Sequence, residues 1–338
     1  MEHHAPHRRA AFEGYYSKFD LPSGAHIALI VCQVRGAKSN PHIVSFNYVP
    51  QDVSRAFQKD VYVDNIDMLE FGKDHSFGLE VKGLGYARWN ADATAEYSFD
   101  HEDFSFHGKT TSPTPWSQHT STPEALLAYL PLPLHWHVQS LASECDFQMK
   151  LPGYDLPEAD RSGLAMVHEE KNWAQGFPSA HMWLQTRDKD SSFCAAGGQI
   201  LGMDAFLIGY RGKGLSLDFR PPFSLRFLGL GPFLSYAHDW ENREFQLDVK
   251  RFGLFGWQRL KIKATAPKGT FFTLSAPFPE GFRENFLAES FQATFEVKVY
   301  ESGWFTGWNL VREEVFTGSS LEFGGGYYPP AGSKEKIH

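Results

Sequence analysis

Strict alternation of apolar and polar residues marks three segments in the second half of the chain, at 243–251, 257–266 and 291–300. A period of two residues predicts half-buried β-strands. Turn signals separate such segments, for example RGKG at 211–214 and APKG at 266–269. Regular strands and turns with few helices predict an all-β fold, built from antiparallel barrels or sandwiches.

Other segments suggest a helix and a division of the chain. STPEALLAYL at 121–130 is expected to form one short helix, because Pro123 suits a first turn and Pro131 ends it. The segment LPGYDLPEADRSG at 151–163 has the composition of a linker. We therefore expect two β-rich domains, at residues 12–150 and 164–338.

A short internal echo favours two structurally related halves. FEGYYSKFDLPSGAHIAL, from Phe12, resembles HEEKNWAQGFPSAHMWL, from His168. Self-similarity over half a chain is typical of repeated architecture, although a chance match is the alternative. The alignment places opposite each other Glu13 and Glu170, Tyr16 and Trp173, and His26 and His181.

Composition narrows the function. The 338 residues include 30 Phe, 13 Tyr, 9 Trp, 30 Gly and 20 Pro, which suits strands and turns. A formal charge of −8 argues against a nucleic-acid partner. Cys32, Cys145 and Cys194 are widely spaced and are expected to be buried thiols. With no signal peptide and no apolar run that could span a bilayer, we expect a cytoplasmic protein.

The strand at 180–187 is expected to have two different faces. His181, Trp183 and Gln185 share one face, and the other face is purely apolar. We interpret the polar and aromatic face as the wall of a lumen that binds a flat, apolar ligand.

The strand EEKNW before it alternates in the same way. Glu169, Lys171 and Trp173 fall on one face, and Glu170 and Asn172 on the other. These groups suit proton transfer and hydrogen bonding to a ligand. The alternative is structural: a buried ion pair and an amide that fix the closure of a barrel, with Trp173 in its core.

The first half offers a similar face. Glu13, Tyr15 and Ser17 are expected on one side of a strand, with Tyr16 opposite. A glutamate beside a tyrosine can supply a proton and orient a phenol or carbonyl. Plain β structure is the alternative, because tyrosine is common in strands.

Histidines raise the question of a metal. His135 and His137 lie two apart on one strand face, a spacing that suits a metal, and His101 and His107 are the candidates for a third ligand. No ligand set is convincing, so we expect no metal and no cofactor. His3, His4 and His7 are expected in a disordered tail. No GxSxG, P-loop or GxGxxG motif is present.

The stretches FEGYY and EKNWAQGFPSAHMWLQ resemble two motifs of the tocopherol cyclase family. The resemblance implies two lipocalin-like β-barrels, an architecture shared with fungal Diels–Alderases. It also implies cofactor-free ring closure, by addition of a phenol to a prenyl double bond or by a pericyclic reaction. The stretches depart from the family motifs at Tyr15, at Ala174 and at AHM, residues 180–182, so a different substrate end of the pocket is expected. No plastid transit peptide is visible, so we expect another lipophilic natural product rather than tocopherol.

We therefore predict a cofactor-free cyclase of specialised metabolism, acting on a prenylated aromatic, polyene or polyketide. Glu170 is the predicted proton donor, because Trp173, Trp183 and Phe177 are expected to surround it and raise its pKa. A lipocalin-like carrier is the main alternative, and a metal-dependent hydrolase or isomerase using His135 and His137 is another. The predicted catalytic residues are Glu170, Lys171 and Asn172, and the predicted substrate-binding residues are Trp173, Trp183, Gln185, His181, Glu13, Tyr16 and His26.

Overall fold

The computed structural model describes residues 4–328 and confirms the all-β prediction. The chain forms two compact units: unit 1 is Met1–Phe177 with Pro277–Phe282, and unit 2 is Pro178–Ala276 with Arg283–His338. Within residues 4–328 the helices are short 3₁₀ segments, and none is long and apolar enough to cross a membrane. These segments are η1 (Val53–Arg55), η2 (Ala125–Tyr129) and η3 (Glu158–Asp160).

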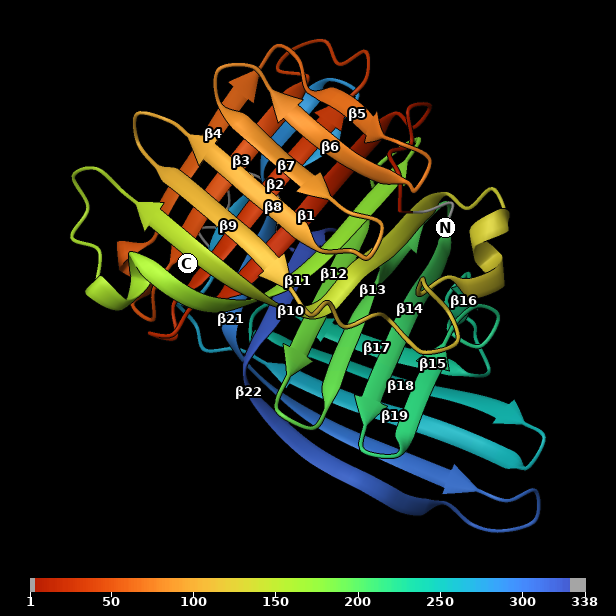
Figure 1. Ribbon diagram of the computed structural model, residues 1–338. Coiled ribbons are helices and arrows are strands. Elements are labelled where there is room, and N and C mark those ends of the chain that lie inside the picture. The colour runs from red at the N-terminus through yellow and green to blue at the C-terminus, as the bar shows by residue number, and fades with distance from the viewer. Residues whose placement is uncertain (1–3, 329–338) are drawn as a thin grey trace. The chain divides into compact units, whose positions relative to one another are not determined.

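Unit 1 is built on one antiparallel sheet of 11 strands, in the order β4-β3-β2-β1-β11-β10-β9-β8-β7-β6-β5 (Figure 1). The first strand of the unit therefore pairs with its last. The strands are β1 (Phe12–Asp20), β2 (His26–Val34), β3 (His42–Val49), β4 (Phe57–Val63), β5 (Asp67–Phe71), β6 (Ser76–Val81), β7 (Gly85–Trp89), β8 (Ala95–Asp100), β9 (Ser105–Thr111), β10 (Leu134–Lys150) and β11 (Ser162–Ala174).

The sheet of unit 1 curls around a large aromatic core. Tyr15 of β1 and Phe77 of β6 are far apart in the strand order, yet their ring centroids lie 5.7 Å apart. Phe46 of β3 stacks on Phe104, next to β9, at 4.6 Å. Residues of most strands join this core. We call the side of the sheet that meets it the core face.

Unit 2 has a second antiparallel sheet, in the order β15-β14-β13-β12-β22-β21-β19-β18-β17. It also curls, since Phe206 of β14 and Phe245 of β18 lie 6.1 Å apart in one core. β16 pairs with β14, and β20 pairs with β21. The strands are β12 (Ala180–Arg187), β13 (Ser192–Ile200), β14 (Met203–Gly212), β15 (Leu215–Phe219), β16 (Leu225–Phe227), β17 (Leu234–Asp239), β18 (Glu244–Gly253), β19 (Gly256–Thr265), β20 (Phe272–Phe278), β21 (Gly281–Ser302) and β22 (Asn309–Gly325).

The units share a topology, but the sequence echo misaligned them. In each unit a four-strand meander begins with the strand that pairs with the unit's last strand, so β1 corresponds to β12 and β11 to β22. The echo instead matched β1 with β11. Those two strands are neighbours in one sheet, where Glu13 pairs with Trp173 and Tyr16 with Glu170.

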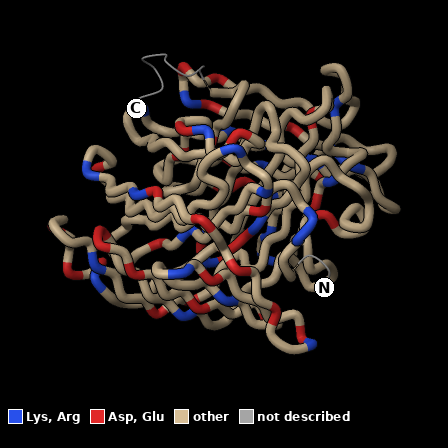
Figure 2. Tube along the Cα trace, turned by 90° about the horizontal axis from the view of Figure 1, so that it is seen from above, with Lys and Arg blue, Asp and Glu red and all other residues tan. Residues whose placement is uncertain are grey.

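Two further expectations differ from the structure. The boundary between units lies at Phe177, not at 151–163, because β11 pairs with β1 and β10 and so completes unit 1. The helix expected at 121–130 is the short 3₁₀ segment η2. The three cysteines are buried free thiols, as expected. Lys and Arg residues are interspersed with Asp and Glu residues along the chain (Figure 2).

The close pairing of β12 and β13 predicts a sharp glycine requirement. Gly198 pairs with His181 at a φ of +153°, and a Cβ there would lie 2.0 Å from the carbonyl oxygen of Ala180. Gly198→Ala should lower the free energy of unfolding by about 3 kcal/mol or more. Gly253→Ala, where no atom lies within 4 Å of the added Cβ, is the matched control and should change it little. If chemical denaturation showed the same change in the free energy of unfolding for both variants, the glycine requirement at residue 198 would be wrong.

Candidate functional site

The pairing of β1 with β11 brings the two motif stretches together. Tyr15 pairs with Lys171, and Ser17 pairs with Glu169, so their side chains meet on the core face of unit 1. The predicted sharing of one face by Glu13, Tyr15 and Ser17 is confirmed, since the first two are hydrogen-bonded and Ser17 bonds to a core tyrosine. The core face therefore carries two carboxyls and one amine.

An ion pair between Glu13 and Lys171 is buried in this face. Lys171 Nζ lies 2.9 Å from Glu13 Oε1, both side chains are fully buried, and the Tyr15 hydroxyl donates to the same oxygen at 3.1 Å. Burial lowers the pKa of Lys171, and Glu13 opposes that shift. Burial alone would raise the pKa of Glu13, but Lys171 and His7 lower it to about 2. Glu13 is therefore ionised at neutral pH, with the Lys171 amine as its nearest cationic partner.

The N-terminal segment covers this pair and is not a disordered tail. His7 donates its backbone N–H to Glu13 at 2.7 Å, and Lys171 donates to the carbonyl oxygen of Ala5 at 2.6 Å. The His7 ring stacks on Trp173 at 3.7 Å, and His135 also stacks on Trp173, at 5.0 Å. The expectation for His7 was wrong because aromatic stacking and a buried charge pair hold the segment. His3 lies outside the described residues.

Glu169 is a second buried carboxyl, with a different environment. The Tyr97 hydroxyl donates to Oε1 at 2.6 Å, Trp89 Nε1 donates to the same oxygen at 3.2 Å, and Ser143 Oγ lies 3.1 Å from Oε2. Burial raises the pKa of Glu169 to about 7, although these three hydrogen bonds favour the charged form. The sequence predicts a raised pKa at Glu170, one residue away, instead.

A protonated Glu169 completes a chain of hydroxyl groups. Its Oε2–H can donate to Ser143, Ser143 can donate to Ser140 at 2.8 Å, and Ser140 can donate to the carbonyl oxygen of Thr114 at 3.5 Å. Each hydroxyl group has one proton, and in this arrangement each donates it to one acceptor. The chain runs from the core to a bulge in β10.

That bulge presents a polar side chain without a protein partner. In the β10–β11 ladder Val138 pairs with Glu170 and Ser140 with Glu169, so Gln139 is an extra residue. Bulges often re-aim a side chain next to a binding site. Gln139 is 4% exposed, and neither atom of its amide has a hydrogen-bond partner among residues 4–328.

Gln139 lines a pocket of about 510 Å³ in unit 1, within the range of roughly 300–1,000 Å³ typical of small-molecule sites. His4 and His137 are on the same wall, with their ring centroids 6.4 Å apart. Burial, the largest cause, lowers the pKa of His4 to about 4, so its ring is neutral at pH 7. The other lining residues include Ala91, Ala93, Pro115, Trp116, Thr122, Leu126, Ala128, Tyr129 and Val138.

The remaining predicted residues of unit 1 lie on the opposite side of the sheet. Glu170 and Asn172 alternate with the core-face residues, and Glu170 Oε2 lies 2.9 Å from His168 Nε2. Trp173 does not lie beside Glu170, because the two side chains leave β11 on opposite faces. Tyr16 is half-buried, and His26 Nδ1 lies 2.8 Å from Asp20. The proposed roles of these residues stay predictions.

The predicted residues of β12 belong to unit 2. Ala180, Met182 and Leu184 enter the core of that unit, so His181, Trp183 and Gln185 lie on its other face. The three are buried, and His181 Nε2 lies 3.1 Å from Glu322. Their face is turned away from the core of unit 2, and their role in ligand binding stays a prediction.

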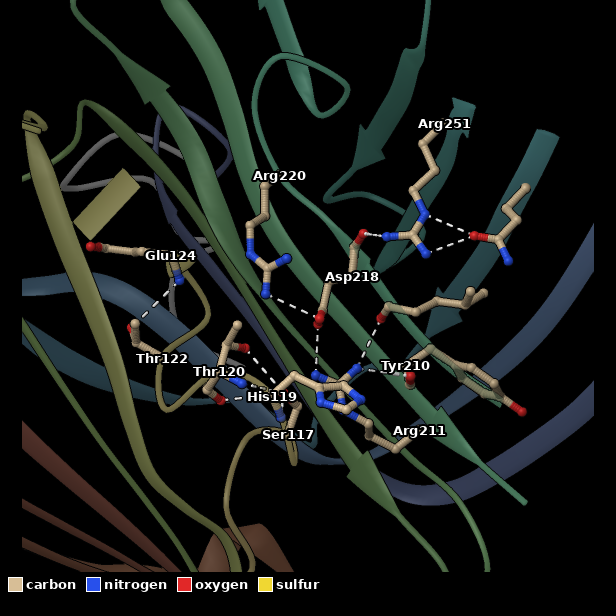
Figure 3. Close-up of polar contacts among 12 residues, drawn as sticks. Ser117, His119, Thr120, Thr122, Glu124, Tyr210, Arg211, Asp218, Arg220 and Arg251 are labelled. Carbon is tan, nitrogen blue, oxygen red and sulfur yellow. Dashed lines mark hydrogen bonds and ion pairs between the residues drawn. The ribbon is translucent and has the colours of Figure 1, made fainter. Parts of the chain in front are cut away.

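Other polar clusters serve as structural anchors. In unit 2, Arg211 and Arg220 lie 2.6 Å and 3.0 Å from the carboxylate of Asp218 (Figure 3). In unit 1, the buried Glu124 accepts from His135 Nδ1 at 2.9 Å and from the backbone of Trp136. His135 is thus tied to Glu124. His101 and His107 pair with Asp103 and Asp100, so three of the four histidines considered as metal ligands have separate acidic partners.

The buried ion pair predicts strong coupling. Lys171→Met should lower the free energy of unfolding by about 3–5 kcal/mol, because it leaves a buried carboxylate without its cation. Adding Glu13→Gln to Lys171→Met should recover more than half of that loss, as measured by chemical denaturation. Additive losses in the double variant would contradict the assignment of a charged pair.

Glu169 predicts a pH dependence of stability. Its folded-state pKa is about 7, against an ordinary value of 4.5. The contribution of Glu169 to the free energy of unfolding is therefore complete below pH 4.5 and is lost as the pH rises to about 7. Relative to Glu169→Gln, the wild type should lose about 3 kcal/mol over that window. Other titrating groups, including His4 and His7, cancel in the comparison. If the free energies of unfolding of the two proteins changed in parallel with pH, Glu169 would be ionised over the whole window in the folded protein.

Comparisons with known proteins identify the fold. No protein-family model matches the chain, and no curated protein sequence matches it. Among solved structures, CghA with Sch210972 aligns at a TM-score of 0.60 with 11% identity, over 93% of this chain and 88% of CghA. Kievitone hydratase from Nectria haematococca aligns at 0.52 with 9% identity, over 95% of this chain and 91% of that enzyme. At these identities the likeness establishes the two-unit β fold of these proteins.

Proposed function

We propose that the protein is a cofactor-independent enzyme that closes a ring in a lipophilic small molecule bound in the pocket of unit 1. The observation that carries this proposal is Gln139. Its amide is buried in the pocket wall, and neither of its polar atoms has a hydrogen-bond partner among residues 4–328. An unsatisfied buried polar group costs about 1–3 kcal/mol, and a ligand carbonyl or hydroxyl that bonds to it removes that cost.

The pocket suits a flexible, mostly apolar substrate with one polar end. Trp116, Ala128 and Val138 provide apolar wall, and Tyr129 extends it toward solvent. Such a wall can hold a polyene or prenyl chain with its reacting ends together, which is worth about 7–11 kcal/mol of the barrier in well-oriented intramolecular reactions. Gln139 can both donate to and accept from the polar end.

Ring closure needs no co-reactant. In a pericyclic closure, or in the addition of a phenol O–H across a double bond, substrate and product are isomers. The resemblance to the tocopherol cyclase family suggests this chemistry, and one structural neighbour is named as a hydratase, an enzyme of the same fold. The raised pKa of Glu169 supports proton chemistry over simple carriage, because a carboxyl that titrates near pH 7 can both give and take a proton, which a carrier does not require. The hydroxyl chain that starts at Glu169 includes Ser140, which follows Gln139 in β10.

The test compares two glutamines on the same strand. The purified protein is incubated with the precursor that accumulates when its gene is deleted, and products are separated by chromatography. Gln139→Leu should lower turnover by about 10–100-fold without lowering thermal stability, because the variant removes an unsatisfied amide. Gln148→Leu, at an exposed position of β10, is the matched control and should keep full activity.

Other outcomes decide between the alternatives. Tight binding of the precursor without product would establish a carrier. Full turnover by Gln139→Leu would exclude this pocket as the site. The same assay tests Glu170: if it supplies a proton, Glu170→Gln should lower turnover by about 10²–10⁴-fold while ligand binding persists.

A further inference from the structure

Two hairpin tips of unit 2 expose large apolar side chains to solvent. The tip between β18 and β19 presents Leu254 and Phe255, which are 87% and 91% exposed. The tip between β21 and β22 presents Phe305, which is 101% exposed, and the partly exposed Trp304 and Trp308. Soluble proteins seldom cluster such residues at full exposure unless the surface meets a partner or a membrane.

The two tips are held next to each other. Trp304 Nε1 donates to the carbonyl oxygen of Leu254 at 3.1 Å. The Trp304 ring lies 6.1 Å from Trp257 and 6.3 Å from Phe252. Phe252 in turn contacts Phe223 at 5.1 Å. An aromatic base therefore supports the tips, and their exposure is a feature of the fold.

The charge pattern around the tips indicates what they meet. Residues 252–258 and 302–311 contain no Asp, Glu, Lys or Arg. The exposed Arg312 follows the second segment and donates to the carbonyl oxygen of Lys213, which is itself exposed. The neighbouring Arg259 is neutralised by Asp248. Two exposed cations, Lys213 and Arg312, thus stand at one border of an uncharged apolar surface, and the exposed Glu301, which accepts from Gln258, stands at another.

From this arrangement we infer that unit 2 docks on anionic lipid bilayers through the two tips. Leu and Phe favour the acyl boundary of a bilayer, Trp favours its headgroup interface, and basic residues favour anionic headgroups. Narrow protruding tips reach between headgroups, whereas a protein partner is usually met by a broader, flatter surface. Leu254, Phe255 and Phe305 enter the bilayer, and Lys213 and Arg312 contact phosphates.

Vesicle sedimentation of the full chain tests this inference. The probes are phosphatidylcholine vesicles with and without phosphatidylserine, at low and physiological salt. The wild type should sediment with phosphatidylserine vesicles, and its tryptophan emission should shift to the blue. Leu254→Ser/Phe255→Ser/Phe305→Ser should bind about 100-fold more weakly, because each side chain loses its apolar burial. Lys213→Glu/Arg312→Glu should lose the preference for phosphatidylserine.

The control removes three highly exposed leucines from other turns of unit 2: Leu201→Ser/Leu228→Ser/Leu230→Ser. It should bind as the wild type does. If the tip variant does not fold, as judged by circular dichroism, Phe305→Ser alone replaces it. The inference is overturned if the wild type ignores both vesicles, if tip and control variants bind equally, or if the tip variant only dissociates an oligomer seen by light scattering.

Discussion

The register between β1 and β11 is the constraint on which the site depends. A slip of one residue would send every side chain of a strand to the other face. The buried pair of Glu13 and Lys171 opposes such a slip, because it would leave two charges without partners in an aromatic core. The same register places Glu169 on the core face and Glu170 on the other. The N-terminal segment completes the arrangement by covering the charged pair.

One core face therefore holds two carboxyls whose pKa values are shifted in opposite directions. Glu13 is kept ionised by an ammonium group, while Glu169 meets only neutral donors and has a raised pKa. The two pKa values differ because the two carboxyls have different neighbouring groups, since both side chains are buried. The bulge in β10 then turns Gln139 away from the ladder and into the pocket. In the proposed function, Gln139 is the polar anchor of the pocket, and the hydroxyl groups of Ser143 and Ser140 link the buried Glu169 to the same bulge, where water competes least with these hydrogen bonds.

Much of the fold followed from the sequence, and less of the site did. Alternation in segments such as 291–300 gave the strands, and the face shared by Glu13 and Tyr15 was predicted correctly. The partner of Lys171 was not, because it lies 158 residues away in the chain and only strand pairing identifies it. Gln139 carries no local signal, since a bulge depends on the neighbouring strand. His4 and His7 were misjudged because a polar N-terminus resembles a tail until its aromatic partners are known.

A lipophilic substrate dissolves in a bilayer, so an enzyme that docks on membranes would meet it there. The proposed function depends first on ligand binding in the pocket of unit 1. Photolabelling addresses it most directly. A diazirine-bearing isoprenoid is photolysed with the protein, with and without excess precursor, and labelled peptides are identified by mass spectrometry. The account predicts labelling within residues 115–139 that the precursor suppresses. Labelling that the precursor suppresses only elsewhere, with residues 115–139 unmodified, would contradict it.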